Sequence, residues 1–226
     1  MRQFWGKLLF MHWPIEAELL RPLIPKRLTI DTYEGKAWIG VVPFTMWGVR
    51  PTFTPPFPGL SAFHELNVRT YVHYDGVPGV WFFSLDANNA PAVWAARNFL
   101  ALPYFNARIT LEQQAETIRY SSTRTHKDAP SAGLETTWKI GESLEASAPG
   151  SLAFFLTERY CLYAARNDKK LYRLRIFHPV WPLRRASLSS FDSTMVEALT
   201  LPTPAGEPLL HYAEKLKVDI WPLVKL

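Results

Sequence analysis

Residues 65–73 read Glu65-Leu66-Asn67-Val68-Arg69-Thr70-Tyr71-Val72-His73, in which apolar and polar side chains alternate. Successive side chains of a β-strand point to opposite faces, so this period of two predicts a strand with one apolar and one polar face. The polar face carries Glu65, Asn67, Arg69, Tyr71 and His73. Such a row fits a solvent-exposed sheet face, and it also fits the lining of a cavity, where a carboxylate and a guanidinium bind a polar ligand. The alternation leaves both environments open, because one strand fits either side of a sheet.

Strand patterns dominate the rest of the chain. They cover residues 8–13, 28–32, 37–49, 65–74, 80–85, 105–111, 117–125, 135–140, 159–164, 171–177 and 212–221. These segments are rich in β-branched and aromatic residues and are bounded by turn residues. Asp75-Gly76 lies between two of them and predicts a tight hairpin turn, because both residue types accept a positive φ.

Helix patterns are few and short. The predicted helices span residues 15–21, 92–100 and 151–158. The second follows Pro91, and Asn88 and Asn89 are available to cap its N-terminus. Many strands with few helices predict a β-rich α+β fold, an antiparallel closed or cone-like β-barrel with a few peripheral helices. Without a repeat or a linker composition, residues 1–226 are expected to form a single domain.

The composition indicates a folded, soluble domain. The 226 residues carry 25 Lys and Arg against 20 Asp and Glu, a net charge of +5, and 48% of them are hydrophobic. Abundant aromatic residues and a low net charge exclude a disordered chain. The single cysteine excludes a disulfide framework and a cysteine-rich zinc site. No run of roughly 18 apolar residues predicts a membrane span, and the N-terminus lacks a signal-peptide cleavage site, so we expect a cytoplasmic protein.

The sequence predicts neither a nucleic acid nor a metal ion as a partner. Basic residues are scattered, and part of their densest group, Asn167-Asp168-Lys169-Lys170, is typical of a hairpin turn with solvated charges. No nucleic-acid-binding motif accompanies it. The six histidines show no metal-ligand spacing, and no glycine-rich phosphate loop is present. We therefore expect no cofactor, and the sequence leaves the oligomeric state open, a homo-oligomer included.

The chain resembles the acetoacetate decarboxylase-like superfamily in an ordered set of positions. These are the site glutamate at Glu65, hairpin glycines at Gly76 and Gly79, a helix start at Pro91-Ala92, a helix arginine at Arg97 and a proline at Pro103. The two consecutive lysines of the decarboxylases fall on Tyr104 and Phe105. Neither residue can form a Schiff base, so the resemblance implies the fold and a cavity without the central lysine chemistry.

A closer resemblance, to the YqjF-like family of uncharacterised bacterial proteins within that superfamily, covers nearly the whole chain. It rests on the segments Glu65-Leu66-Asn67-Val68-Arg69-Thr70-Tyr71, Phe155-Leu156-Thr157-Glu158-Arg159-Tyr160, His178-Pro179-Val180-Trp181-Pro182-Leu183 and Val218-Asp219-Ile220-Trp221-Pro222-Leu223. The resemblance implies a fold and a cavity rather than a known reaction.

The resemblance implies a cavity lined by the polar row of residues 65–71, with Tyr104 at the former lysine position. Glu65 and Tyr104 are the candidate catalytic residues, and the ligand-binding candidates are Asn67, Arg69, Tyr71, Arg97, Glu158, Arg159 and His178. From pattern alone, Arg97 is also typical of a surface arginine, Glu158-Arg159 of a structural ion pair, and His178 of a buried core histidine. Lys139 replaces the missing lysine only if its side chain is buried, where a lowered pKa makes an amine nucleophilic.

Three functions fit these residues. The first is a small-molecule-binding protein whose ligand is a carboxylate or keto acid held by arginine. The second is a lyase, hydratase or cyclase acting on a keto acid, with Glu65 as general base, Tyr104 or His178 as acid, and Arg69 stabilising an oxyanion. The third is a protein-interaction module in which the polar row is ordinary surface. Inward or outward orientation of Glu65 and Arg69 separates the third from the first two.

Overall fold

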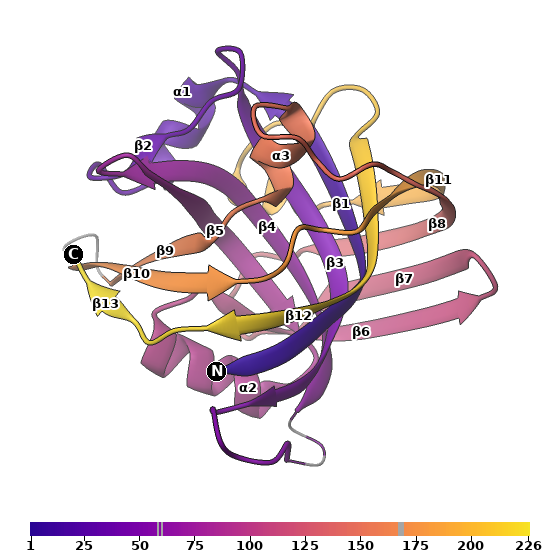
Figure 1. The fold of residues 1–226 in the computed structure, drawn as a ribbon, viewed down its shortest axis with the longest axis horizontal. Helices are drawn as coiled ribbons and strands as arrows, with labels where there is room; N and C mark the ends of the chain where they lie inside the picture. Colours follow the sequence, from indigo (N-terminus) through magenta and orange to yellow (C-terminus); the bar gives the residue numbers. More distant parts are fainter. Residues whose placement is uncertain (58, 60, 167–169) are drawn as a thin grey trace.

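A computed structural model describes residues 1–57, 59, 61–166 and 170–226 of the chain. Strands form most of it, and short helices lie at its edges (Figure 1). The β-rich α+β class predicted from the sequence is therefore confirmed. The hairpin turn predicted at residues 167–170 lies, for its first three residues, outside the described residues.

The strands belong to one hydrogen-bonded sheet. They are β1 (Arg2–Ile15), β2 (Thr29–Ile30), β3 (Ala37–Arg50), β4 (Ala62–Tyr74), β5 (Val77–Ala87), β6 (Tyr104–Gln114), β7 (Thr117–Arg124), β8 (Gly133–Ser143), β9 (Cys161–Arg166), β10 (Lys170–Phe177), β11 (Leu183–Ser193), β12 (Leu209–Ile220) and β13 (Val224–Lys225). The helical segments are α1 (Ala17–Leu20), η1 (Arg21–Leu23), α2 (Ala90–Ala95), η2 (Ala96–Leu100), α3 (Leu152–Thr157) and η3 (Glu197–Leu199).

The strand pairings form two rings. Following them from β5 through β6, β7, β8, β11, β12, β1, β3 and β4 leads back to β5. A shorter path runs from β5 through β9 and β10 to β12 and returns along the same β1, β3 and β4. The strands β12, β1, β3, β4 and β5 therefore belong to both rings, and we call β1, β3 and β4 the shared wall.

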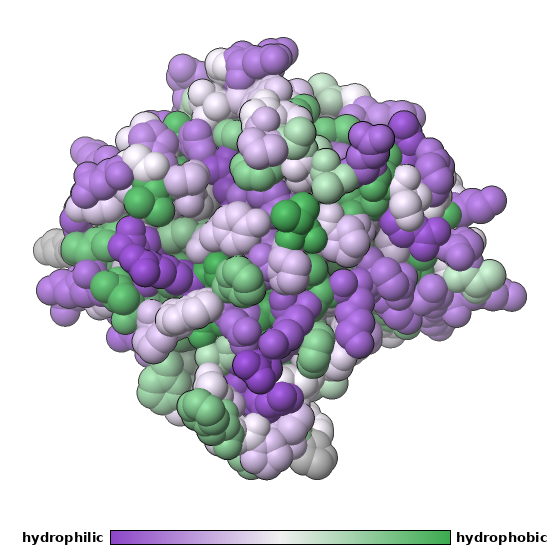
Figure 2. Space-filling view, in the orientation of Figure 1, coloured by the Kyte–Doolittle hydropathy of each residue, from purple (hydrophilic) through white to green (hydrophobic). Residues whose placement is uncertain are grey.

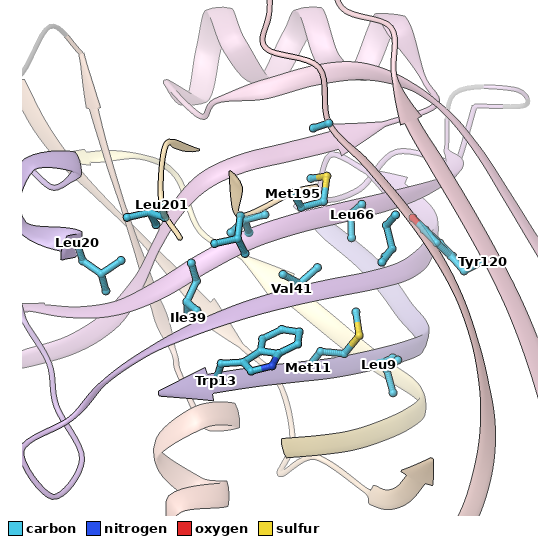
Figure 3. Close-up of a cluster of buried hydrophobic side chains, with 14 of the residues drawn as sticks. Leu9, Met11, Trp13, Leu20, Ile39, Val41, Leu66, Tyr120, Met195 and Leu201 are labelled. Atoms are coloured by element: carbon cyan, nitrogen blue, oxygen red, sulfur yellow. The ribbon is translucent and has the colours of Figure 1, made fainter. Parts of the chain in front are cut away.

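Both faces of the shared wall are buried. Along β4, Leu66, Val68 and Val72 pack into one hydrophobic core, which Figure 3 shows between β1, β3, β4 and Tyr120 of β7. The alternate residues of the same strand, Phe63 and Tyr71 among them, belong to a second core on the opposite face. The polar row from Glu65 to Tyr71, predicted from the alternation of β4, therefore points into the protein rather than into water, and His73 at its end is half-buried.

Parallel pairing is the main departure from the expected antiparallel sheet. β5 pairs in parallel with both β6 and β9. Parallel neighbours need a crossover connection, and the segment α2–η2 supplies it between β5 and β6. Asn89 caps α2, its side chain accepting a hydrogen bond from the Ala92 backbone N–H at 3.1 Å. Of the two cap candidates, Asn89 is thus the one used.

Most predicted strands are found and extend beyond their predicted ends. The hairpin at Asp75-Gly76 is confirmed, with φ values of 48° and 71° at the two turn residues. Two strands, β11 and β13, were not predicted from the sequence. β11 is polar and largely exposed along its length, so it carries little of the apolar periodicity by which a strand is predicted. β13 has only two residues.

Hydrophilic residues cover much of the surface seen in Figure 2, with hydrophobic residues scattered between them. Within the described part of the chain, no helix is long and apolar enough to cross a membrane. Cys161 is a free, buried thiol on β9.

The ion pair between Asp86 and Arg124 links β5 to β7 over the intervening strand β6. Arg124 Nε and Nη2 each donate to a different Asp86 oxygen at 2.8 Å, and both side chains are almost fully buried. Removing one partner of such a pair leaves a buried charge without a counterion, which costs about 3–5 kcal/mol.

We therefore predict that Asp86→Asn lowers the free energy of unfolding by about 3–5 kcal/mol in urea denaturation. The matched control is Glu142→Gln, which breaks the exposed pair with Arg185 and changes the same quantity by less than about 1 kcal/mol. Equal effects of the two substitutions would contradict a structural role for the buried pair.

Candidate functional site

A cavity of about 320 Å³ lies on the second-core side of the shared wall. The α2–η2 segment and strands β5, β9 and β10 contribute its other sides. Most of the side chains that line it are hydrophobic, and Glu65, Asn67 and Arg69 of β4 form a polar row along one wall. The first residue of β6, Tyr104, lines the same cavity. The structure thus brings together four of the residues named from the sequence.

Glu65 is a buried carboxyl group with a raised pKa. Its side chain is 2% exposed, and the Tyr104 hydroxyl donates to Glu65 Oε2 at 2.7 Å. Burial raises the pKa of Glu65 to about 8; hydrogen bonds from Tyr104 and Asn67 oppose this rise, and the nearby Asp86 charge adds to it. Glu65 is therefore mostly protonated at neutral pH, and it can give or take a proton near that pH.

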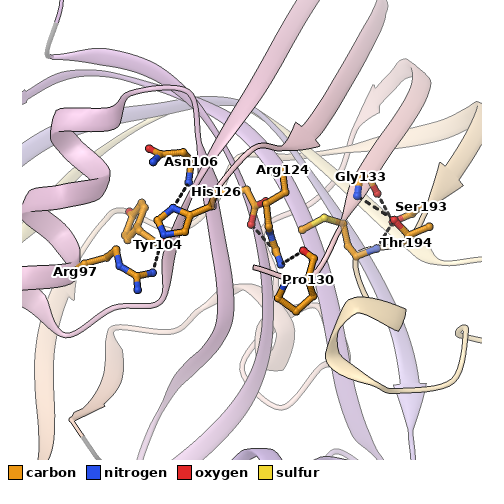
Figure 4. A network of polar contacts seen from close by, with 11 residues as sticks. Arg97, Tyr104, Asn106, Arg124, His126, Pro130, Gly133, Ser193 and Thr194 are labelled. Atoms are coloured by element: carbon orange, nitrogen blue, oxygen red, sulfur yellow. Dashed lines mark hydrogen bonds and ion pairs between the residues drawn. The ribbon is translucent and has the colours of Figure 1, made fainter. Parts of the chain in front are cut away.

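Tyr104 is held by its neighbours at the start of β6. It pairs in parallel with Leu85 of β5, and Arg97 Nη1 donates to its carbonyl oxygen at 2.6 Å, as Figure 4 shows. Burial, followed by the adjacent Glu65, raises the pKa of the Tyr104 hydroxyl well above its ordinary value. The hydroxyl therefore stays protonated and acts as a hydrogen-bond donor inside the cavity.

Arg69 is a buried cation without a carboxylate partner. The residue is 9% exposed, and no Asp or Glu among the residues that the structure describes forms an ion pair with it. Its Nη2 donates to the Leu156 carbonyl at 3.1 Å and to the Tyr71 hydroxyl at 3.3 Å. Its Nε has no hydrogen-bond partner, and the guanidinium lies over the Phe10 ring at 5.0 Å. Its positive charge is thus held by neutral groups.

His12, which no sequence pattern indicated, supports Arg69 through Tyr71. The Tyr71 hydroxyl donates its one proton to the Leu156 carbonyl at 2.7 Å, so His12 Nε2, 2.6 Å away, donates to the Tyr71 oxygen. Burial, the positive Arg69 and then His211 hold the pKa of His12 well below its usual value, so His12 is neutral. Gly40 makes room for it, because a Cβ there would lie 2.8 Å from the imidazole ring.

The remaining predicted residues surround the cavity without lining it. Tyr71 supports Arg69, and Arg97 lies outside the cavity, where it holds Tyr104. Glu158 accepts the Trp181 backbone N–H at 2.9 Å. Arg159 forms an ion pair with Asp31 at 2.6 Å and stacks on Phe155, and His178 stacks on Tyr160 with ring centroids 4.7 Å apart.

Trp181, held by Glu158, does line the cavity. Glu158 and His178 therefore contact Trp181, which lines the cavity, but do not line the cavity themselves. Lys139 is exposed on β8, so it does not supply a desolvated amine. Within residues 1–57, 59, 61–166 and 170–226, no cluster of three or more His, Cys, Asp or Glu side chains is arranged to hold a metal ion.

Comparison with known proteins supports both resemblances seen in the sequence. Residues 2–217 match the model of the DUF2071 family, described as an uncharacterized conserved protein. The uncharacterized protein YqjF of Bacillus subtilis (strain 168) is 42% identical over 225 residues, which cover 100% of this chain and 92% of YqjF.

Two solved structures share the fold at low sequence identity. The enduracididine biosynthesis enzyme MppR, complexed with pyruvate, aligns with a TM-score of 0.67 and 12% identity over 99% of this chain and 89% of its own. An acetoacetate decarboxylase-like enzyme from Sphingomonas wittichii RW1 aligns with a TM-score of 0.65 and 10% identity over 100% of this chain and 92% of its own.

The raised pKa of Glu65 predicts how stability depends on pH. Since the folded-state pKa, about 8, exceeds the ordinary value of 4.5, the unfolded chain ionises first as pH rises. The wild type is therefore expected to lose stability between about pH 4.5 and pH 8 relative to Glu65→Gln, with no further relative change above pH 8. Denaturant unfolding of both proteins across this range measures the difference in the free energy of unfolding.

Tyr104→Phe removes a hydrogen bond to the Glu65 carboxylate, so it raises the pKa of Glu65 further and extends the loss of stability to higher pH. A constant difference between pH 4.5 and 8 would mean that Glu65 titrates normally.

Proposed function

The chain belongs to the DUF2071 family, and it shares its fold with acetoacetate decarboxylase-like enzymes. From this premise, we propose that the protein binds a small carboxylic acid, such as a keto acid, in the cavity beside β4. In this proposal, Arg69 binds the carboxylate, and the Glu65–Tyr104 pair binds a second oxygen of the ligand. The ring through β9 and β10 acts as a barrel-like wall around the ligand, and the protein works in the cytoplasm without a bound cofactor.

One observation carries the proposal, namely the unpaired positive charge of Arg69 inside an apolar cavity. Burying a charge without a counterion is costly, and the described residues supply no carboxylate to it. A ligand carboxylate provides that counterion and hydrogen-bonds to the guanidinium with the strength of a charge-assisted pair. Support for a keto acid comes from MppR, a protein of the same fold that was solved with pyruvate bound.

The proposal excludes Schiff-base chemistry at this site. The position that matches the decarboxylase lysine holds Tyr104, and the next residue is Phe105. No lysine in the described ranges lines the cavity. A ligand carbonyl is therefore expected to receive a hydrogen bond here rather than a covalent bond to an amine.

A second candidate function is an enzyme that moves a proton of a keto acid, as a lyase, hydratase or cyclase does. The pKa of Glu65 near 8 favours it, because a general base works best when its pKa is close to the working pH. Glu65 would take a proton from the carbon next to the carbonyl, while Tyr104 donates a hydrogen bond and Arg69 stabilises the negative charge. His178 does not line the cavity, which leaves Tyr104 as the acid.

The third hypothesis, a protein-interaction surface formed by the polar row, required this row to be exposed on the surface. Glu65, Asn67 and Arg69 are each less than a tenth exposed. A partner protein therefore cannot contact them on the folded surface.

Arg69→Met tests the carboxylate-binding role. Removing a charge-assisted hydrogen bond is expected to weaken binding of pyruvate or phenylpyruvate roughly 10- to 100-fold in isothermal titration calorimetry. The control is Arg119→Met, which removes an exposed arginine of β7 and leaves the affinity unchanged. The neutral methyl esters of the same acids are expected to bind both variants equally. Wild-type affinity of Arg69→Met for the acids would refute the assignment.

Deuterium exchange tests the second candidate function. If Glu65 acts as a base, the protein exchanges the C3 protons of a bound keto acid into D2O, and the rate rises as pH passes through about 8. Glu65→Gln is expected to abolish this exchange while keeping ligand binding. Borohydride added to the same samples is expected to trap no lysine adduct. Exchange by Glu65→Gln at the wild-type rate would remove Glu65 as the base.

A further inference from the structure

The walls of the cavity are far more apolar than a pyruvate-sized ligand requires. Apart from Gln3, Glu65, Asn67, Arg69 and Tyr104, every lining residue is hydrophobic. These residues come from both sides of the cavity, including Leu162 of β9 and Leu174 of β10. Contact with such walls favours apolar ligand surface by about 25 cal/mol for each Å² removed from water.

The volume of the cavity is also larger than the volume of the smallest keto acids. Water occupies about 30 Å³ per molecule in the liquid, so 320 Å³ corresponds to roughly ten waters. Pyruvate fills only part of this space and leaves the rest to water against apolar walls, where few hydrogen-bond partners are available. A larger apolar body displaces that water and gains contact area.

The charged and hydroxyl groups define one polar edge of the ligand. Glu65 and Arg69 are four residues apart on the same face of β4, which separates their Cα atoms by about 13 Å. Both side chains extend from the backbone into the cavity, so a ligand that reaches both groups carries its polar groups along one side. The lining residues contributed by η2, including Phe99 and Leu100, are apolar.

The charge balance of the site accepts one negative charge. Among the described residues that line the cavity, Arg69 is the one arginine or lysine, and it forms no ion pair; Glu65, with its pKa near 8, is mostly neutral at pH 7. A second carboxylate on the ligand would be buried against the apolar walls without a counterion. Dicarboxylates are therefore disfavoured.

Aromatic rings gather beside Arg69. Trp5 and Trp181 stack with ring centroids 6.2 Å apart, and Trp181 meets Phe10 edge-on at 5.2 Å. Arg69 lies over that same Phe10 ring. Flat rings of this kind pack well against a planar or branched apolar group.

We propose that the ligand is a monocarboxylic acid with a bulky apolar body, aryl or branched alkyl, whose carboxylate lies at Arg69 and whose keto or hydroxyl oxygen lies at Tyr104 and Glu65. This inference rests on the proposed function and names the class of acid that the cavity selects. Size and apolarity of the ligand body, rather than the carboxylate, then determine specificity.

A series of acids tests the inference on the wild-type protein. Calorimetric titration is expected to give affinities for phenylpyruvate and 4-methyl-2-oxopentanoate at least about tenfold above that for pyruvate. The dicarboxylate 2-oxoglutarate is expected to bind more weakly than 4-methyl-2-oxopentanoate by a similar factor. Equal affinity for pyruvate and the bulky acids would overturn this inference and leave the proposed function intact. Binding of none of the acids would overturn the proposed function itself.

Filling the cavity provides an independent test. Ala96 of η2 lines the cavity and is buried, so Ala96→Leu is expected to lower the affinity for phenylpyruvate at least about tenfold and to leave that for pyruvate unchanged. The matched control is Ala90→Leu, an exposed position of α2 outside the cavity. Unchanged phenylpyruvate affinity in a folded Ala96→Leu protein would place the apolar body elsewhere. If that variant does not fold, the wild-type series decides.

Discussion

The burial of both faces of the shared wall is the constraint on which the rest of the structure depends. β1, β3 and β4 separate two hydrophobic cores, so every side chain along their central parts lies in the interior. A polar residue on such a strand cannot reach bulk water and must find partners inside the protein. This constraint applies to Glu65, Asn67 and Arg69, which are all buried. Its side chains meet a cavity rather than a packed core, and there a ligand can satisfy them.

The positive charge of Arg69 is not neutralised by any carboxylate among the described residues. The groups that hold its guanidinium, the Leu156 carbonyl, the Tyr71 hydroxyl and the Phe10 ring, are all neutral. His12 fixes Tyr71 and is itself neutral because burial lowers its pKa. Elsewhere in the chain, buried arginines are neutralised, as Arg124 is by Asp86 and Arg159 by Asp31. The contrast between Arg69 and these two arginines is the physical basis for the proposal of a carboxylate ligand.

The sequence allowed the strands of the wall and the key side chains to be predicted, and it left their environment open. The alternation of β4 identified Glu65 and Arg69 but left open whether they face water or a cavity, because only the long-range pairing of β1 with β3 and of β3 with β4 decides what covers each face. Matching to the decarboxylases placed Tyr104 near Glu65, and their oxygens are 2.7 Å apart. The roles of His12 and Gly40 could not be predicted, because a single histidine or glycine within a strand forms no sequence motif. Glu158 and His178 have charged or aromatic signatures, yet they act on neighbours such as Trp181 rather than on the cavity.

The most direct test of the account is a crystal structure of the protein soaked with phenylpyruvate. The account predicts one bound molecule in the cavity beside β4, with a carboxylate oxygen about 3 Å from a nitrogen of Arg69 and the keto oxygen within hydrogen-bond distance of Tyr104. A carboxylate bound away from Arg69, or a cavity that holds only water at saturating ligand, would contradict it.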